Sequence, residues 1–537
     1  MAGKRKLKAS LRASSHFIRW ALTKRKQGQQ NIPKNGKIRL RMRVRKFFVK
    51  YDRRIQRGLE ILPGFISWNL ILFPLWGVFL IPLAVAYYVL LFDIFWLYKS
   101  ITLAFTGTIS HLRIKASQKM DWLGEVKLFP DWRKVQHLII IPNYQEPPHI
   151  LERTLESLAT QTFPKRQISI ILAFEAREKD WRKKADFLKK KYANKFGNLL
   201  VTVHRLKRGE TAGKHSNSRH AIQVAKKKLI KTGQYNPNYV TVTSCDADHV
   251  FHQQHFAYLA FKFLDDPERY LKLWQPALMF YNNFWRLPAL TRVVNTFCTI
   301  WNTAILARPD RLISCQNYSL SFKLLDEAGS WDPNIIPEDY HMFFKAFFEK
   351  QGKVEVEPIF LPLWADAAES NSFWGTVKNQ YQQLKRWAWG VSDDPYVVKN
   401  YFGDSKISFW TKTIRLLRVL EDHILWPVNW FIITLGITIP SLLNPNFSRT
   451  VIGYSLPRLS TLILTFCLLF LVVILIIDAK QRPPRPAHVS RLRALLLPLE
   501  FILMPISGFF FNALPGLDAH TRLMLGKYIE YKVTEKV

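Results

Sequence analysis

Long apolar blocks at both ends of the chain constrain its fold more than any other feature of the sequence. Residues 65–105 are almost continuously apolar, and further apolar blocks occupy residues 424–443, 462–477 and 494–514. A helix needs roughly 20 mostly apolar residues to cross a bilayer, so these blocks predict an integral membrane protein. The first block has room for two crossings joined by a minimal turn, and one long tilted helix is the alternative.

The charge of the chain is strongly basic, with 78 Lys and Arg residues against 40 Asp and Glu and a net charge of +38. Such a balance is typical of proteins that bind nucleic acid or an anionic membrane surface. The apolar blocks favour the membrane, and we expect no nucleic acid partner. The basic N-terminal segment, residues 1–63, lacks the apolar core of a cleavable signal peptide. Its part beside the first apolar block is expected to lie against anionic lipid in the cytoplasm.

Residues 132–400 have the pattern of a soluble α/β domain. Short β-branched or apolar runs predict strands at residues 135–142, 167–174, 199–204 and 239–245. Amphipathic patterns between them predict helices at residues 149–160, 181–195 and 213–228. Strands and helices that alternate in this way favour a mainly parallel sheet, whose ligands bind beyond the carboxyl ends of the strands.

The fourth predicted strand breaks into the run Asp246-Ala247-Asp248-His249. Two carboxylates one residue apart at the end of a strand can face a single divalent cation. Magnesium and manganese take oxygen ligands and bridge to phosphates, which makes either ion a candidate cofactor. A simple turn is the alternative, because Asp is common in turns.

Other polar residues follow the first three strands and are expected at the same edge of the sheet. Asn143 and Glu146 follow the first strand, and Glu175 follows the second. Beyond the third, Lys214 lies in the run GETAGKHSN, which opens a helix. Helix N-termini favour anions, so this lysine is a candidate phosphate ligand, although the spacing is not that of a P-loop.

Two later motifs complete the candidate site. Glu338 and Asp339 open an apolar-periodic helix. Acids there stabilise the helix dipole, but a carboxylate so placed can also act as a general base toward a hydroxyl. Gln383, Arg386 and Trp387 are spaced i, i+3 and i+4, so they share one helical face and form a candidate pocket lining.

The order of these motifs between membrane segments resembles the membrane-embedded family 2 inverting glycosyltransferases, such as cellulose, chitin and hyaluronan synthases. The C-terminal run YKVTEK is similar to the Phe-x-Val-Thr-x-Lys gating loop of bacterial cellulose synthase. Two residues depart from the family pattern: Glu175 replaces the usual Asp, and Pro337 replaces a common Thr. The similarity covers roughly residue 65 to the C-terminus.

The resemblance implies an α/β GT-A (Rossmann-like) catalytic domain combined with an α-helical transmembrane region. It implies a nucleotide-diphosphate sugar as donor, for which we expect a UDP-sugar, with magnesium or manganese as the cation. Residues that would bind the donor are Asn143, Glu146 and Glu175 at the nucleoside, Lys214 at the diphosphate, and Asp246.

The resemblance also implies that Asp248 would coordinate the metal, with His249 as a further candidate ligand. Asp339 would be the catalytic base. Residues that would line the acceptor site and the leaving diphosphate are Glu338, Gln383, Arg386 and Trp387. Residues that would form the gate are Tyr531, Val533, Thr534 and Lys536.

The expected organisation has seven segments, with the catalytic domain in the cytoplasm and the helices in a bacterial inner membrane. These are a basic segment (1–63), a transmembrane pair (64–107), the GT-A domain (132–400), an amphipathic interface helix (401–422), a second transmembrane pair (423–478), a basic loop with an interfacial or re-entrant helix (479–514), and a gating-loop-like segment (515–537). Basic loops stay cytoplasmic, which with Pro498, Glu500 and Pro505 favours four crossings and a surface helix at 494–514.

Three functions remain open from the sequence. Processive synthesis of a polysaccharide with coupled export is favoured by the Gln-x-x-Arg-Trp pattern. Transfer of single sugars to a lipid or short glycan is favoured by the short membrane region. A non-catalytic scaffold or anionic-polymer binder is disfavoured by the intact Asp248, Asp339 and Arg386.

Overall fold

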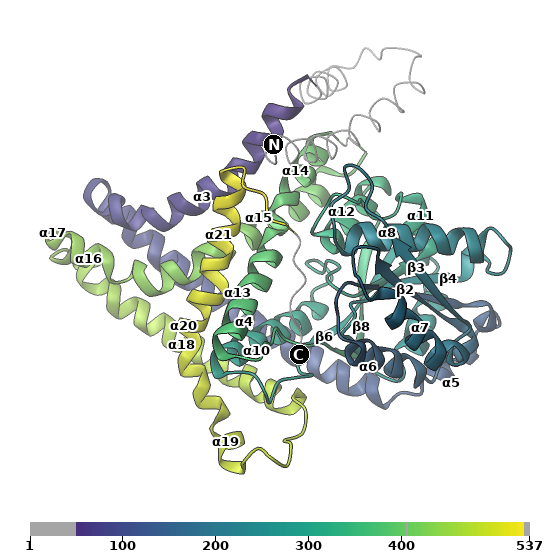
Figure 1. Cartoon of the computed structure of the whole chain (residues 1–537). Coiled ribbons are helices and arrows are strands. Elements are labelled where there is room, and N and C mark those ends of the chain that lie inside the picture. Colours follow the sequence, from purple (N-terminus) through teal and green to yellow (C-terminus); the bar gives the residue numbers. More distant parts are fainter. Residues whose placement is uncertain (1–49, 404–405, 531–537) are drawn as a thin grey trace.

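The computed structural model describes residues 50–403 and 406–530. A mixed β-sheet covered by helices forms one part, and long apolar helices extend away from it to form the other (Figure 1). The four gating residues predicted at 531–536 lie outside the described residues, as does most of the basic N-terminal segment.

The first half of the sheet is parallel and consists of the four predicted strands. These strands are β1 (Gln136–Asn143), β2 (Ile168–Glu175), β3 (Asn198–His204) and β4 (Val240–Ser244). β1 lies between β2 and β4, and β3 pairs with the outer side of β2, all in parallel register. The carboxyl ends of these four strands therefore meet at one edge, as the sequence predicted.

The second half of the sheet was not predicted from the sequence. It contains β5 (Val250–Phe251), β6 (Lys272–Met279), β7 (Tyr318–Ser321) and β8 (Glu355–Trp364). The order across the sheet is β3-β2-β1-β4-β7-β6-β8-β5. β7 runs antiparallel to both β4 and β6, so the sheet is mixed and not uniformly parallel.

Two hydrophobic layers cover the faces of the sheet. Alternate residues of β1 point to opposite faces, with Leu138 and Ile140 in one layer and Ile139 and Ile141 in the other. The first layer is covered by α8 (Lys214–Ala225), α11 (Phe322–Glu327) and α12 (Glu338–Glu349). The second is covered by α5 (Trp122–Lys127), α6 (Pro148–Ala159), α7 (Trp181–Tyr192) and α9 (His255–Asp265). All three helices predicted between the parallel strands are confirmed.

The first apolar block forms a hairpin of α3 (Asp52–Leu80) and α4 (Pro82–Lys119), which excludes the single long helix. The chain reverses at Ile81, and the hydroxyl of Tyr88 donates to the carbonyl of Leu70 at 3.1 Å across the hairpin. Pro82 starts the second helix, where its missing N–H costs nothing. Asp93, in the middle of α4, is fully buried and faces Ser460 of α18.

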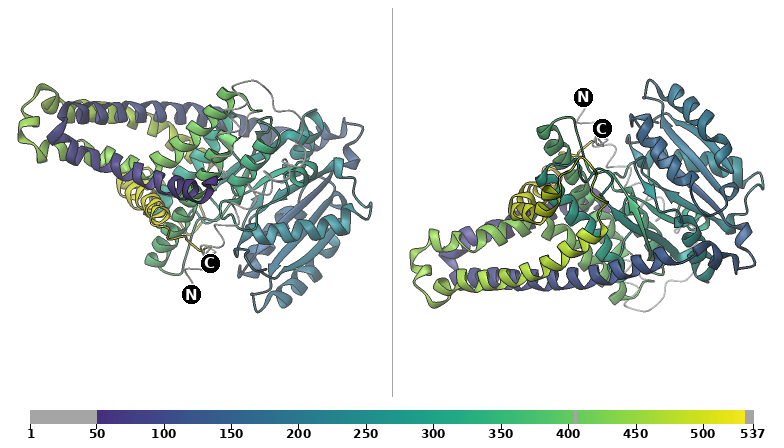
Figure 2. Two further views of the ribbon diagram at one scale, coloured as in Figure 1. Left: turned by 90° about the horizontal axis from the view of Figure 1, so that it is seen from above. Right: turned by 90° about the horizontal axis from the view of Figure 1, so that it is seen from below.

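Four helical segments run side by side from the α/β domain to a common tip (Figure 2). They are α3, α4, α15 (Phe409–Phe431) continued by η9 (Ile432–Gly436) and α16 (Ile439–Leu443), and α18 (Val451–Gln481). At the tip, Asn444 donates to the carbonyl of Val78 at 2.8 Å. Length and composition select α3, α4 and α18 among these segments as able to cross a membrane, so the two pairs of crossings remain a prediction. The predicted boundary at residue 422 is wrong, because α15 continues through it without a break.

The helical stretch Arg491–Met524 runs across these segments instead of alongside them (Figures 1 and 2). It comprises α19 (Arg491–Leu496), η10 (Leu497–Leu503), α20 (Met504–Gly508), η11 (Phe509–Ala513) and α21 (Leu514–Met524). By length and composition it could cross a membrane, as could α3, α4 and α18. Its contacts lie on both parts of the molecule. Glu500 pairs with Arg292 at 2.7 Å and Asp518 with Lys385 at 3.1 Å, while α21 packs on α3 and η11 packs on α15. The interfacial or re-entrant position of residues 494–514 remains a prediction.

The stretch 424–443 is not one of the apolar spans that length and composition select among the described residues. Its helix α15 begins with a charged half that contains Glu421 and Asp422, and its apolar half is interrupted at η9 and before Pro440. The helix is therefore apolar over only part of its length.

Candidate active site at the carboxyl edge of the sheet

A cavity of about 890 Å³ opens at the carboxyl edge of the sheet and continues between the long helices. All twelve described residues that the sequence predicted for the site line it. Contributions come from the ends of β1, β2 and β4, from the start of α8 and α12, and from α13 (Phe373–Ala388). Segments more than 200 residues apart in the chain thus meet around one space.

Asp246, Asp248 and His249 form a group that can hold a metal ion. One ligand atom from each lies within 4.8 Å of the other two. Asp248 is buried, and its Oδ2 accepts the backbone N–H of Asp366 at 3.2 Å, which fixes the orientation of the carboxylate. Two carboxylates and one imidazole suit Mn²⁺ or Mg²⁺.

The imidazole of His249 is oriented by Asn317, whose Nδ2 lies 3.1 Å from His249 Nδ1. The other ring nitrogen, Nε2, lies 4.0 Å from Asp246 Oδ2. The Asn317 amide thus fixes the orientation of the imidazole ring beside Asp246. Sequence reasoning did not identify Asn317, because a single Asn before a strand carries no recognisable pattern.

Lys214 is the cation nearest to the metal group. Its Nζ lies 2.7 Å from Asp246 Oδ1 and 3.2 Å from Glu338 Oε1. Burial alone would lower the pKa of Lys214, but the attraction of Asp246, Glu338 and Asp339 holds this pKa well above its ordinary value. Burial also raises the pKa of Glu338, to about 7, against the opposing effect of Lys214. Lys214 therefore stays charged at the N-terminus of α8, where backbone N–H groups also favour an anion.

Asp339 is held by the backbone on both sides of its carboxylate. Its Oδ2 accepts the N–H of Gln316 at 2.5 Å, and its Oδ1 accepts the N–H of Tyr340 at 2.9 Å. Its main-chain carbonyl accepts the hydroxyl of Ser314 at 2.8 Å. The carboxylate thus lines the cavity in a fixed orientation, as a general base requires.

The loop 314–317, just before β7, was missed by sequence reasoning although it contacts three parts of the site. The carbonyl of Gln316 accepts from Lys214 Nζ at 2.5 Å, in addition to the bond that its N–H makes to Asp339. Gln316 has a φ of 50°, a left-handed conformation that costs a non-glycine residue about 1 kcal/mol or more. The loop acts through the backbone of Gln316 and through the side chains of Ser314 and Asn317, and single residues of these types form no recognisable pattern.

The predicted nucleoside residues lie at the ends of β1 and β2. Asn143 Oδ1 accepts from Lys184 Nζ at 3.3 Å, and the same Nζ donates to the carbonyl of Glu146 at 2.7 Å. Glu175 Oε2 accepts from Arg177 Nε at 2.5 Å. The guanidinium of Arg177 lies 3.7 Å from the centre of the Tyr144 ring. Lys184 and Arg177, which sequence reasoning did not select, thus orient the predicted residues.

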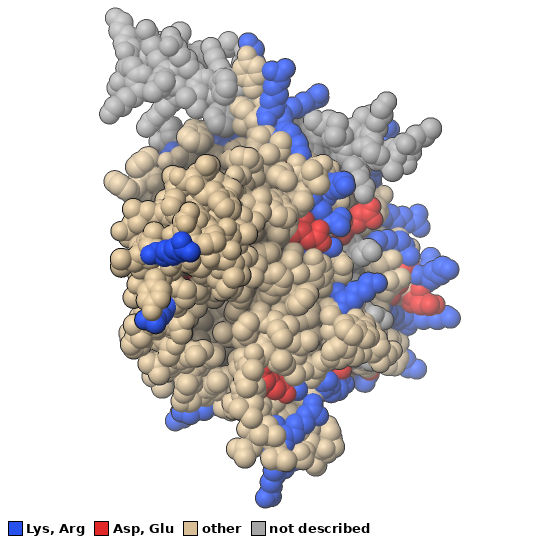
Figure 3. Space-filling view, turned by 90° about the vertical axis from the view of Figure 1, so that its left-hand side faces the viewer, with Lys and Arg blue, Asp and Glu red and all other residues tan. Residues whose placement is uncertain are grey.

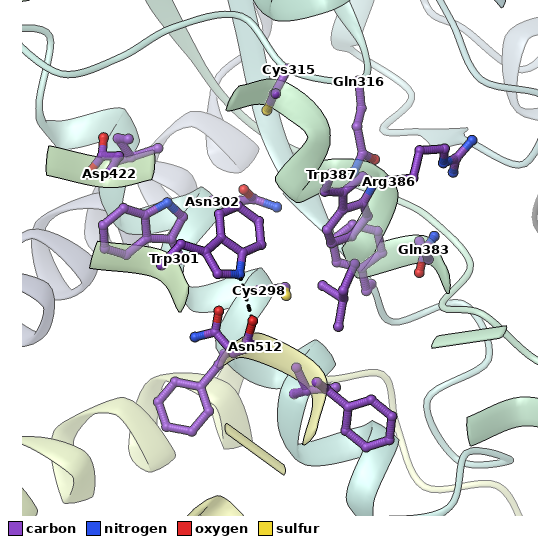
Figure 4. A pocket seen from close by; sticks show the side chains of 18 of the residues that line it. Cys298, Trp301, Asn302, Cys315, Gln316, Gln383, Arg386, Trp387, Asp422 and Asn512 are labelled. Carbon is purple, nitrogen blue, oxygen red and sulfur yellow. Dashed lines mark hydrogen bonds between the residues drawn. The ribbon is translucent and has the colours of Figure 1, made fainter. Parts of the chain in front are cut away.

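The third motif places Gln383, Arg386 and Trp387 along the cavity wall on α13. The ring of Trp387 projects into the cavity, while the guanidinium of Arg386 extends to one side (Figure 4). Trp387 packs against Phe280 with ring centres 5.5 Å apart. The side chain of Gln316 extends toward Trp387 from the opposite wall.

A buried ionic cluster connects α12 to the segment after α13. Both ring nitrogens of His341 face carboxylates, with Nδ1 2.7 Å from Asp393 and Nε2 3.0 Å from Asp332. Burial would lower the pKa of His341, but the two carboxylates raise it to about 9. The protonated imidazole therefore ties the helix that carries Asp339 to η8 (Trp389–Asp393).

Comparison with protein families agrees with this geometry. Residues 138–315 match the model described as Glycosyl transferase family 2, and residues 241–477 match the model described as Glycosyl transferase family group 2. No curated protein matches the chain. The two matches together run from the α/β part into the long helices. The expected fold class, a GT-A type sheet combined with apolar helices, is confirmed.

Several solved structures are similar at low identity. The mannosyltransferase PcManGT from Pyrobaculum calidifontis, in complex with GDP-Man and Mn²⁺, is 13% identical, over 82% of this chain and 100% of that chain, with a TM-score of 0.43. TarS 1-349 from S. aureus, in complex with UDP-GlcNAc, is 15% identical over 74% of this chain and 94% of that chain, with a TM-score of 0.32. GalNAc-T7, with UDP, GalNAc and Mn²⁺, is 13% identical over 55% of this chain and 56% of that chain, with a TM-score of 0.30.

Proposed function

We propose that the protein is a membrane glycosyltransferase that transfers a sugar from a nucleotide-diphosphate sugar to an acceptor hydroxyl with inversion. One observation carries the proposal: the metal group, Lys214 and the fixed carboxylate of Asp339 surround a single cavity in a chain matched by family 2 glycosyltransferase models. A non-catalytic scaffold would have no need for a carboxylate fixed by two backbone N–H groups.

The donor would lie along the carboxyl ends of β1, β2 and β4. Asn143, Glu146 and Glu175 would hold the nucleoside, for which a uridine is our first candidate. Lys214 and the N-terminus of α8 would face the diphosphate. Asp248, with Asp246 and His249, would hold magnesium or manganese, which supplies positive charge to the diphosphate when bound.

The chemistry assigned to the chain is a single displacement. Asp339 takes the proton of the acceptor hydroxyl, and the hydroxyl oxygen forms a bond to the anomeric carbon. The bond from that carbon to the diphosphate oxygen breaks on the opposite side, and the diphosphate leaves with the electron pair. Lys214 and Arg386 stabilise the negative charge of the leaving group. One base suffices, and no covalent enzyme intermediate forms.

The acceptor would enter along the face of α13, where Gln383 and Trp387 line the cavity beside Glu338. Trp387 offers an aromatic surface with a polar edge, which suits a sugar or an amphiphilic headgroup. Two acceptor classes fit the same chemistry, a growing polysaccharide with coupled export and a lipid or short glycan. The catalytic domain would face the cytoplasm of a bacterial inner membrane.

Nucleotide release by the detergent-purified full-length protein tests the proposal. It would be measured across a panel of nucleotide sugars with magnesium or manganese. We expect release from one donor, lost in Asp339→Asn and retained in Asp326→Asn, a control that changes an exposed surface pair with Lys226. The absence of both release and donor binding across the panel would overturn the proposal.

A further inference from the structure

The second half of the cavity is apolar and lies between the long helices. Below the Asp339 edge its walls come from α4, from α10 (Ala289–Ala304), from α15 and η9, from α18, and from α20 and η11. Its apolar lining includes Phe297, Ile433, Leu464, Leu468, Leu471 and Phe511. The space that contains the candidate base is therefore continuous with one that has mostly hydrocarbon walls.

The margins of this apolar half are α18 on one side and α20 with η11 on the other. α18 packs mainly on α4 and α20 packs on α10. Ile300 of α10 also clusters with Ile474 and Ile477 of α18, so both margins border α10. Both carry exposed apolar side chains, with Leu468 52% and Phe510 52% exposed. The face of the long helices that Figure 3 shows has few charged groups. An opening between these margins would face the hydrocarbon of a bilayer and not water.

The dimensions of the apolar half match one leaflet. Its wall on α18 runs from Ile474 down to Leu464, and α18 meets the catalytic domain at Asp478, which accepts the hydroxyl of Tyr281 at 2.7 Å. From Ile474 to Leu464 the helix rises about 15 Å at 1.5 Å per residue. One leaflet of hydrocarbon is about 15 Å thick, half of a bilayer core.

A band of polar groups separates the apolar half from the catalytic edge. Asn302, Asp422 and Asn512 line the cavity there, with Trp301 between them (Figure 4). Trp426 Nε1 donates to the main-chain carbonyl of Asn512 at 3.1 Å, which fixes one side of the band. Along the cavity the lining thus changes from the Asp339 carboxylate to the polar band and then to apolar side chains. A lipid changes in the same order from its headgroup to its chain.

From this order we infer that the acceptor is a membrane lipid with a hydroxyl in its headgroup. The lipid chain lies in the apolar half, entered sideways between α18 and α20, and the headgroup hydroxyl reaches Asp339 past the polar band. This inference rests on the proposed function and narrows its acceptor. A polysaccharide along the same path would place many of its hydroxyls against Leu, Ile and Phe side chains, and hydroxyls left unpaired there are costly. The hydrogen-bonding side chains of this half include Asn429, Thr434 and Ser507.

The test uses the full-length protein in nanodiscs made from a bacterial total lipid extract, with the radiolabelled donor that supports nucleotide release. We expect the label to move into the chloroform–methanol phase and to resist mild acid, as a glycoside of a hydroxyl does. Label found only in a water-soluble, ethanol-precipitable product would overturn the inference in favour of a polysaccharide. Acid-labile label, which marks a lipid phosphate acceptor, would overturn the hydroxyl assignment.

A matched pair of substitutions on α18 tests the route. Leu468→Trp fills the apolar half, whereas Leu469→Trp changes a neighbouring side chain that does not belong to the cavity lining and is 60% exposed. We expect Leu468→Trp to lower lipid labelling at least tenfold with unchanged donor affinity, and Leu469→Trp to stay within twofold of wild type. Equal effects of the two substitutions would overturn the lateral route. If the wild-type protein binds no donor at all, the proposed function itself is contradicted.

Discussion

Gln316 donates its backbone N–H to Oδ2 of Asp339 at 2.5 Å, and its carbonyl accepts from Lys214 at the same distance. One strained residue therefore links the candidate base to the candidate diphosphate ligand. Strained backbone conformations gather at functional sites, where the surrounding structure holds them in place. The link explains how a base on α12 keeps its position relative to a lysine on α8.

Replacing Gln316 with proline removes the N–H and forces φ to about −65°, so both links should break. A hydrogen bond to a charged group contributes roughly 1.5–3 kcal/mol, and we expect Gln316→Pro to lower kcat about 10- to 100-fold. Gln316→Gly keeps the N–H and favours the observed φ, so its kcat should remain within a few-fold. Nucleotide release under saturating donor measures both.

Gln351→Gly is a control for relief of strain alone, because Gln351 has a φ of 57° and does not line the cavity. It should leave kcat unchanged. Equal losses in Gln316→Pro and Gln316→Gly would show that the side chain, and not the backbone, carries the function of this residue.

The metal group predicts a cation requirement for donor binding. Asp248 is buried and oriented by Asp366, so Asp248→Ala removes a fixed ligand. We expect the manganese concentration that supports half-maximal donor binding to rise at least tenfold, and chelation to abolish binding in the wild type. Titration of a fluorescent donor analogue measures both. Asp180→Ala, at an exposed position, should not differ from wild type. If chelation leaves donor binding unchanged, the metal has no part in binding and that part of the proposal is wrong.

The ion cluster around His341 predicts a pH dependence of stability. Asp393 and Asp332 raise the pKa of His341 to about 9, above its unfolded value of about 6.5. A raised pKa stabilises the fold fully below the unfolded value, and this contribution is lost as the pH rises through 9. The shift corresponds to about 3 kcal/mol at most.

We therefore expect the Tm of the wild type to fall between pH 6.5 and 9.5, and the Tm of His341→Gln to be lower at pH 6.5 but flatter over this range. The difference between the two curves should shrink as the pH rises. Parallel curves would mean that His341 is not the group that titrates.

The sequence predicted one half of the sheet well and the other half poorly. β1, β2 and β3 are apolar runs separated by amphipathic helices, and β4 leads directly into Asp246. β7 has only four residues, and β6 contains Pro276, where its register with β8 shifts, so neither gives a strand signal. Their places are set by long-range pairing, which local patterns do not encode.

The same reasoning explains the site. Lys214 and Trp387 were selected from residue type and spacing, whereas Lys184 and Arg177, although charged, were not. Gln316 contacts Asp339 and Lys214 through an N–H and a carbonyl, which every residue carries, so its position had to come from the fold. The boundary at residue 422 was misplaced because charge marks the surface of α15 but does not end the helix.

Under the proposed function, Lys214 contacts the diphosphate and not the nucleoside. Its Nζ is paired with Asp246 and Glu338, whereas the residues proposed for the nucleoside follow β1 and β2. In Lys214→Met the site keeps its carboxylates and loses its buried cation, so an incoming diphosphate meets uncompensated negative charge. The Kd of the nucleoside diphosphate identified by the donor panel should rise at least tenfold, while that of its nucleoside stays within twofold. Lys183→Met, at a lysine that is 90% exposed, should change neither Kd. Calorimetric titration measures both affinities. An equal loss of nucleoside affinity would show that Lys214 maintains the structure of the whole pocket and does not act on the diphosphate alone.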